Sequence, residues 1–158
     1  MNVPTYDLSV VPYGLLADVL VMRATKARLM AYQPYSRYMV GAAILGTKGS
    51  VFYTGCNVEC ADYDGTHAEE NALGAMVLAG ERDPLLIAVV GGLEGGELSY
   101  APPCGKCRQK IIEFSQLNGR EIYLVVTGEK HDELRLMKMS DLLPGAFGPA
   151  KIGVDVVK

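Results

Sequence analysis

The chain is 158 residues long and 49% hydrophobic, so it is long enough to bury one core without the help of disulfides. Its formal net charge is −3 and it has no run dense in Lys and Arg, which argues against binding along a nucleic acid backbone. No apolar run approaches the roughly 18 residues of a membrane-spanning helix, and residues 1–11 lack the pattern of an export signal. We therefore expect one domain over residues 1–158 that is cytoplasmic and binds a small molecule, with no nucleic acid polymer and no membrane as a partner.

The first half of the chain predicts a helix followed by a hairpin. Over residues 13–30, apolar residues recur at near-helical spacing with charged residues between them, and Pro34 closes this helix. Small and apolar residues predict a strand over residues 38–45. A turn signal at residues 47–50 separates it from a second strand over residues 51–58.

The second half of the chain alternates helices and strands. Residues 67–78 are rich in Ala, Leu, Met and Glu and predict a helix that Gly80 ends. The continuous apolar run at residues 85–90 predicts a central strand buried on both faces, and a glycine-rich loop follows at residues 91–96. Further elements are expected as a helix over residues 104–117 and strands over residues 121–126 and 152–157. This order predicts an α/β fold, a three-layer α/β/α sandwich around a mixed five-stranded sheet.

Two short segments, residues 66–69 (THAE) and 102–107 (PPCGKC), contain the residues of a three-ligand zinc site. His67 and Glu69 are two positions apart and would point about 200° from each other inside a helix, so they can converge only at its first turn. Thr66 is the expected N-cap of that helix. Cys104 and Cys107 are three positions apart and share a face at the start of another helix.

The His and the two Cys of these segments would bind one Zn²⁺ and leave a fourth position open, as in catalytic zinc sites. The two helix starts are expected to favour the thiolate forms of the cysteines. Glu69 is not needed as a ligand and is free for general acid/base work beside the metal. The alternative is a closed structural site with Cys56 or Cys60 as the fourth ligand. Otherwise we expect these two cysteines to be small buried apolar residues.

Four collinear blocks, residues 31–43, 55–59, 66–69 with 102–109, and 142–149, resemble the cytidine deaminase family. The order H-x-E then P-C-x-x-C is shared with zinc nucleobase deaminases. The resemblance implies a cytidine deaminase-like fold and hydrolytic deamination of cytidine and deoxycytidine to uridine and deoxyuridine, with release of ammonia, as in pyrimidine salvage. It also implies one zinc ion per subunit and a homo-oligomer, with a tetramer favoured.

The resemblance assigns roles to individual residues. Glu69 would be the catalytic residue that takes a proton from the attacking water and returns protons to the ring nitrogen and the leaving ammonia. Asn57 and Glu59 would hydrogen-bond the ribose of a cytosine nucleoside. Tyr38, at a position where the family has Phe, would pack on the pyrimidine. Ala68 would be a further substrate-binding residue.

Three features depart from the small members of this family. His67 stands where many of them have Cys, and Glu70 stands where they have Arg. One imidazole and two thiolates around Zn²⁺ sum to zero charge, so a compensating Arg would be unnecessary. Cys60 replaces a usual Asn, and the segment from 60 to 66 is shorter than is common. Residues 67–72 also resemble deoxycytidylate deaminases, but the sequence shows no basic cluster for a phosphate.

Two other functions fit the same motifs. Deamination of another cytosine nucleoside analogue, such as blasticidin S, would use the same zinc chemistry, whereas the acidic charge balance disfavours a polynucleotide deaminase. A non-catalytic, zinc-stabilised interaction module would instead hold its metal with four protein ligands.

Overall fold

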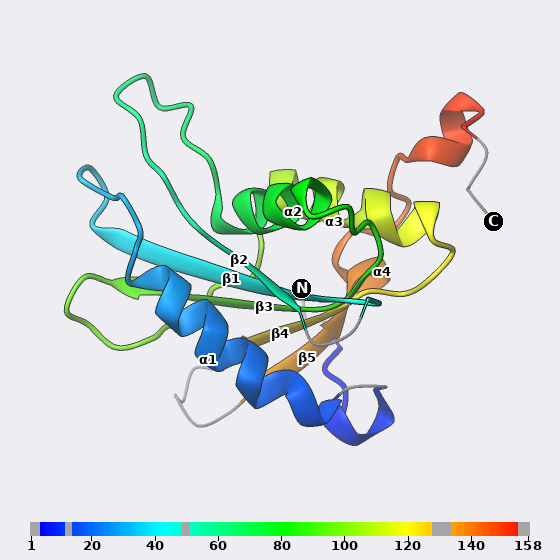
Figure 1. The fold of residues 1–158 in the computed structure, drawn as a ribbon, viewed down its shortest axis with the longest axis horizontal. Helices are drawn as coiled ribbons and strands as arrows, with labels where there is room; N and C mark the ends of the chain where they lie inside the picture. The colour runs from blue at the N-terminus through cyan, green and yellow to red at the C-terminus, as the bar shows by residue number, and fades with distance from the viewer. Residues whose placement is uncertain (1–3, 12–13, 49–50, 128–133, 155–158) are drawn as a thin grey trace.

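A computed structural model describes residues 4–11, 14–48, 51–127 and 134–154 and has a five-stranded sheet at its centre (Figure 1). The strands lie in the order β2-β1-β3-β4-β5. They are β1 (Tyr38–Gly46), β2 (Phe52–Cys56), β3 (Pro84–Leu93), β4 (Tyr123–Thr127) and β5 (Leu134–Lys138). Neighbouring strands are antiparallel except β3 and β4, which are parallel. The predicted mixed sheet is therefore confirmed.

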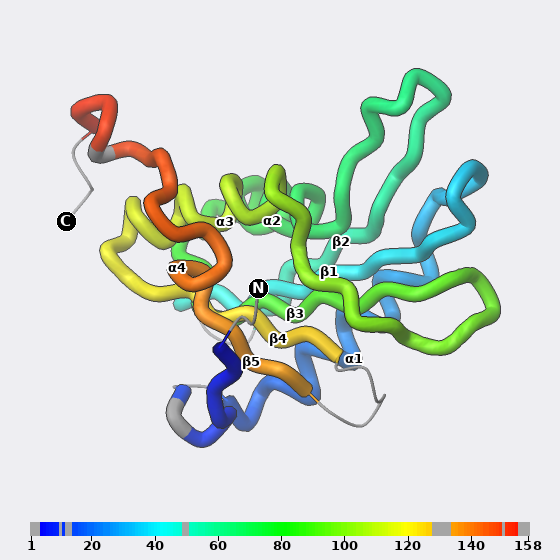
Figure 2. Tube along the Cα trace, turned by 180° about the vertical axis from the view of Figure 1, so that it is seen from behind, coloured from blue at the N-terminus to red at the C-terminus, as the bar shows by residue number. Residues whose placement is uncertain are grey.

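Helices cover both faces of this sheet, as Figure 1 and, from behind, Figure 2 show. Helix α1 (Ala17–Arg28) lies on one face, and α2 (Ala68–Leu78) and α3 (Gly105–Leu117) lie on the other. The shorter helices are η1 (Leu8–Val10), η2 (Gly14–Leu16), α4 (Met139–Leu142) and η3 (Pro149–Ile152). No helix among the described residues is long and apolar enough to cross a membrane. The three predicted layers are confirmed.

Strand β3 is the middle strand and is buried on both faces, as its continuous apolar run predicts. Its side chains alternate between the two faces of the sheet. Ile87 and Val89 belong to the core under α2 and α3, whereas Leu86 and Ala88 belong to the core under α1. Burying one such Leu or Ile stabilises the fold by roughly 1.5–3 kcal/mol, so the sheet is a firm support for the loops at its ends.

Two glycines let helices lie directly against the strands. A Cβ atom at Gly41 would lie 2.0 Å from the carbonyl oxygen of Ala24 in α1. A Cβ atom at Gly55 would lie 2.5 Å from the carbonyl oxygen of Ala68, in the first turn of α2. A larger residue at position 55 would push that turn away from β2, so Gly55 helps to set where α2 begins.

The fifth strand is the main difference from the sequence prediction. It is β5, not residues 152–157: Ile152 ends η3, and residues 155–158 lie outside the described part of the chain. Beside β5, the backbone N–H of Tyr6 donates to the carbonyl oxygen of Leu136 at 2.9 Å, so the N-terminal segment lies along this side of the strand. The strand escaped prediction because it is short and charged residues interrupt its apolar ones.

The other differences concern where elements begin and end. Gly91 and Gly92 belong to β3 and not to a loop, since both pair with β1. The first α-helix begins at Ala17 after a short 3-10 helix, and residue 13, where the sequence predicted its start, lies outside the described residues. These shifts do not change the order of elements that leads to the site.

Candidate metal centre and substrate pocket

Helix α2 begins one residue later than the sequence predicted. Its N-cap is His67, in an extended conformation with φ −88° and ψ 157°, and not Thr66. Thr66 exchanges two backbone hydrogen bonds with Val58, each 2.9 Å, which hold it extended before the helix. Because His67 lies outside the helical turn, its ring and the carboxylate of Glu69 can both reach the same pocket.

The start of α3 positions the two cysteines. Cys104 is the N-cap, with φ −70° and ψ 170°, and Cys107 lies in the first turn. Cys107 is buried, whereas Cys104 is exposed. The guanidinium of Arg108 donates to the carbonyl oxygen of Pro103 at 2.8 Å and to that of Leu142 at 3.1 Å, which fixes the segment before the helix.

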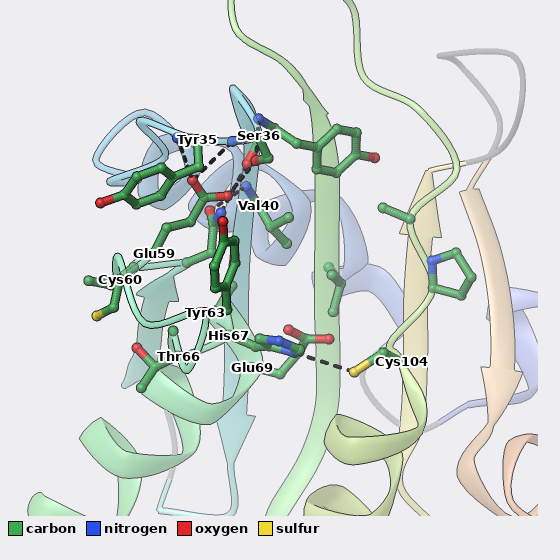
Figure 3. A pocket seen from close by; sticks show the side chains of 18 of the residues that line it. Tyr35, Ser36, Val40, Glu59, Cys60, Tyr63, Thr66, His67, Glu69 and Cys104 are labelled. Carbon is green, nitrogen blue, oxygen red and sulfur yellow. Dashed lines mark hydrogen bonds between the residues drawn. The ribbon is translucent and has the colours of Figure 1, made fainter.

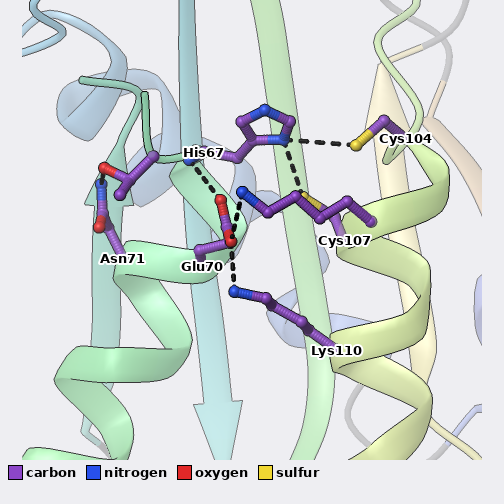
Figure 4. Close-up of polar contacts among 8 residues, drawn as sticks. His67, Glu70, Asn71, Cys104, Cys107 and Lys110 are labelled. Atoms are coloured by element: carbon purple, nitrogen blue, oxygen red, sulfur yellow. Dashed lines mark hydrogen bonds and ion pairs between the residues drawn. The ribbon is translucent and has the colours of Figure 1, made fainter. Parts of the chain in front are cut away.

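The two helix starts bring three metal-ligating atoms together (Figure 4). The Nδ1 atom of His67 lies 3.2 Å from the Sγ atom of Cys107 and 3.3 Å from that of Cys104. All three ligand atoms lie within 4.8 Å of one another. Tetrahedral zinc with bonds of about 2.3 Å to sulfur and about 2.0 Å to nitrogen requires spacings of this size. One imidazole and two thiols therefore fit a zinc ion.

The remaining cysteines lie outside this cluster. Among the described residues, only the three ligands named above form a group of this kind. The thiol of Cys56 donates to the carbonyl oxygen of Met30 at 3.3 Å, and Cys60 is exposed. Neither cysteine is fully buried, so the expectation of two small core residues is wrong, and neither belongs to the ligand group.

Glu69 lies beside this centre and is only 4% exposed. Burial raises the pKa of its carboxyl, and the thiol of Cys107 is its neighbour. Burial, with the charge of Glu69, also raises the pKa of the Cys107 thiol. For Cys107, burial thus opposes the thiolate form that the start of α3 was expected to favour. A bound cation would stabilise the deprotonated sulfur.

A pocket of about 840 Å³ opens beside these residues (Figure 3). His67, Glu69 and Cys104 line it together, and buried Ala68 also lines it. Its walls are rich in aromatic side chains. They are Tyr35, Tyr38, Tyr63 and Tyr100. A pocket of this size and lining suits a small ring-containing ligand.

Tyr38 lies at the start of β1 and contributes to the pocket wall. Its hydroxyl shares a hydrogen bond of 2.7 Å with the Oγ atom of Ser99. A Cβ atom at Gly91 would lie 2.9 Å from the Tyr38 hydroxyl and 2.7 Å from the Cβ of Ala101. Glycine at position 91 therefore leaves the room that the Tyr38 ring occupies.

Asn57 and Glu59 also line the pocket, and both already have protein partners. The amide of Asn57 accepts from the backbone N–H of Val40 at 2.8 Å and donates to the carbonyl oxygen of Tyr38 at 2.9 Å. Glu59 accepts from the backbone N–H and the hydroxyl of Ser36, among others. The hydroxyl contact lowers the pKa of Glu59. Both side chains thus help to shape the pocket wall.

The sequence reasoning missed several pocket residues. Ser36, Tyr63 and Tyr100 line the pocket without having been assigned a role. Ser36 lies within the block of residues 31–43 and Tyr100 lies two residues before the block that begins at 102, so proximity to the motifs was the available signal. Tyr63 lies in the segment that is shorter than usual, where only the folded chain shows which way residues face.

Three protein donors with a buried carboxylate beside them in an open pocket are typical of a zinc-dependent catalytic centre. Residues 17–123 match the family model described as "Cytidine and deoxycytidylate deaminase zinc-binding region". The chain therefore belongs to this zinc-binding deaminase family.

Individual relatives agree with this assignment. The chain is 41% identical to a cytidine deaminase from Halalkalibacterium halodurans, over 82% of this chain and 92% of the relative. It is 40% identical to a cytidine deaminase from Sporosarcina psychrophila, over 82% of this chain and 90% of the relative. The crystal structure of cytidine deaminase from Burkholderia pseudomallei matches with a TM-score of 0.71 and 38% identity, covering 82% of this chain and 98% of that one.

Proposed function

We propose that this protein hydrolytically deaminates cytidine and deoxycytidine to uridine and deoxyuridine. The observation that carries the proposal is the placement of Glu69 beside the three candidate zinc ligands, at the wall of a pocket of about 840 Å³. The similarity to proteins named cytidine deaminase over most of their length supports the choice of substrate.

The proposed reaction exchanges the exocyclic amine of cytosine for an oxygen from water. His67, Cys104 and Cys107 would hold Zn²⁺, which supplies a water of lowered pKa at neutral pH. Glu69 takes one proton from the attacking water and delivers it to the ring nitrogen next to the reacting carbon. The water oxygen forms its bond to the carbon in this attack. Its second proton then passes through Glu69 to the amine, the carbon–nitrogen bond breaks, and ammonia leaves.

Burial suits Glu69 to this proton transfer. Its pKa is raised because water is excluded from its surroundings, so its protonated form is less costly than that of an exposed carboxyl. A general acid/base is most effective when its pKa lies near the working pH. Glu69 can therefore be assigned both the proton uptake and the two proton deliveries.

The remaining pocket residues would bind and orient the nucleoside. We assign the ring of Tyr38 to the pyrimidine face and Ala68 to the base. Asn57 and Glu59 are assigned to the ribose hydroxyls. The Asn57 amide uses one N–H and one lone pair on the protein, which leaves one of each for a sugar hydroxyl.

Ammonia release from a panel of compounds tests this function. The zinc-loaded protein is given cytidine, deoxycytidine, their monophosphates, cytosine and blasticidin S at equal concentrations. We expect the highest kcat/KM with cytidine and deoxycytidine. Absence of ammonia from both nucleosides would refute the proposal, and faster turnover of blasticidin S or of a monophosphate would reassign the substrate.

We further propose that the protein is one catalytic domain that acts as a homo-oligomer, with a tetramer favoured. Large apolar side chains on the described surface support association, since Tyr63 is 94% exposed while also lining the pocket. Light scattering during size-exclusion chromatography would measure the subunit number.

We assign the protein to the cytoplasm, because two of its cysteines must stay reduced to bind a metal.

A further inference from the structure

Glu70 follows Glu69 and has three partners, one at the N-cap of α2 and two on α3 (Figure 4). Its Oε2 atom accepts the backbone N–H of His67 at 2.8 Å. Its Oε1 atom pairs with the ammonium group of Lys106 at 3.2 Å and, more closely, with that of Lys110. The Glu70 side chain is only 8% exposed, whereas each lysine side chain is 48% exposed.

These partners connect the two halves of the metal centre. His67 precedes α2, and Lys106 lies between the two cysteine ligands at the start of α3. Lys110 lies three residues after Cys107, on the next turn of the same helix. One carboxylate therefore holds the backbone of the His ligand on one side and the helix of both Cys ligands on the other.

The charge of this group bears on the departure from the family pattern at this position. Glu70 stands where many small family members have Arg, and two lysines of α3 lie beside it. The Glu70 carboxylate lies between two ammonium groups, so the three side chains together carry one net positive charge.

We propose that Glu70 is a positioning residue that, with Lys106 and Lys110, holds the His67 ligand against the start of α3 and thereby sets the zinc affinity of the centre. The proposal rests on the proposed function only in taking zinc as the bound ion. An ion can bind three donors tightly only if they are already close together, since otherwise binding must order the chain. Residues that orient metal ligands typically contribute about 10- to 100-fold in metal affinity.

Two substitutions separate the contacts of Glu70. Glu70→Gln keeps an oxygen that can accept the His67 N–H but removes the charge that binds both lysines. Lys110→Met removes the closer lysine and leaves Glu70 and the His67 contact in place. The double variant tests whether the two side chains act as one unit. Glu94→Gln is the matched control, because it removes the carboxylate of an exposed ion pair with Arg37 elsewhere.

Zinc affinity, measured by competition with a chelator, is the main readout. We expect Glu70→Gln and Lys110→Met each to weaken zinc binding by about 10-fold or more, and the double variant to lose little beyond either single one. The control should bind zinc as the wild type does. The cobalt(II)-loaded variants should keep the cysteine-to-metal charge-transfer band of the wild type, because all three ligands remain.

Thermal unfolding of the metal-free proteins separates positioning from a general loss of stability. We expect Lys110→Met, at a half-exposed position, to unfold within a few degrees of the wild type while still losing zinc affinity.

Two results would overturn the proposal: wild-type zinc affinity in Lys110→Met and Glu70→Gln, or losses of zinc affinity in the double variant that are strictly the sum of the two single losses. If the wild type deaminates cytidine but the variants bind zinc as tightly as the wild type does, only the proposed role of Glu70 fails. If the wild type binds no zinc, both proposals fail.

Discussion

Glu69 and Glu81 both expose little surface, yet their surroundings shift their pKa values in opposite directions. They lie near the two ends of α2 and are 4% and 3% exposed. Glu81 accepts three backbone N–H groups, from Lys48 and Arg82 at 2.9 Å and from Asp83 at 3.0 Å. Despite its burial, these contacts lower the pKa of Glu81, whereas burial raises the pKa of Glu69.

At Glu81, hydrogen-bond donors outweigh the effect of burial, so burial alone does not decide the state of a carboxyl group. Glu81 is a structural residue: it ties the segment after α2 to the turn after β1, where a Cβ atom at Gly46 would lie only 2.8 Å from its side chain. Glu69 is not held in this way, and its carboxyl faces the pocket beside the ligands. One residue stabilises the fold, and the other is suited to move protons.

The largest expected effect is on catalysis at Glu69. Glu69→Gln should lower kcat by about 10² to 10⁴-fold, the usual contribution of a general acid/base, because an amide cannot carry the proton. Zinc content, measured by metal analysis, should remain at the wild-type level, since Glu69 is not a ligand. Full activity in a zinc-loaded Glu69→Gln protein would remove Glu69 from the mechanism.

The matching substitution at the other end of α2 should affect stability instead. Glu81→Gln should lower the free energy of unfolding by about 1–3 kcal/mol, because a neutral amide binds the three N–H groups less well and its own NH₂ group opposes them. Each kcal/mol lowers the melting temperature by about 2–4 °C in a chain of this size. Calorimetry measures the shift, and kcat at 25 °C serves as the control. A melting temperature equal to that of the wild type would mean that Glu81 does not brace this loop.

The pH dependence of stability should reveal the same contacts. The pKa of Glu81 is lower in the folded protein than its ordinary value of 4.5. A carboxyl with a lowered pKa stabilises the folded state above its unfolded pKa, and this contribution is lost as the pH falls through the folded pKa. Urea unfolding at pH values from 6 downward should therefore show a steeper loss below pH 4.5 for the wild type than for Glu81→Gln. Parallel curves for the two proteins would contradict the assignment.

Substitution of an exposed carboxylate should have the smallest effect and serves as a reference for Glu69 and Glu81. Glu94 pairs with Arg37 at 3.3 Å, with side chains that are 52% and 73% exposed. Surface ion pairs of this kind contribute about 0–1 kcal/mol, and salt screens them. Glu94→Gln should leave both kcat and the melting temperature close to wild-type values. A fall in melting temperature as large as that of Glu81→Gln would show that the exposure of a carboxylate does not predict its contribution to stability.

Local pattern was sufficient for the fold class and for the candidate ligands. The periods of apolar residues predicted the middle strand and the helices on either side of it, because burial on both faces requires an unbroken apolar run. The spacing of His67 and Glu69 required a helix start, and the structure places them there. Boundaries were less predictable: the contact of Thr66 with Val58, made by the backbone, moved the N-cap by one residue.

The sequence by itself determined the order of the elements from α1 to β4, the metal-ligating residue types and the position of Glu69 beside them, since these depend on spacing along the chain. Only the tertiary structure decided how each carboxylate is used. Glu69, Glu70 and Glu81 lie within one short stretch of sequence, yet one faces a pocket, one meets two lysines of α3 and one meets the backbone N–H of Lys48 after β1. Their pKa values and roles follow from these neighbours, which the fold brings together from distant parts of the chain.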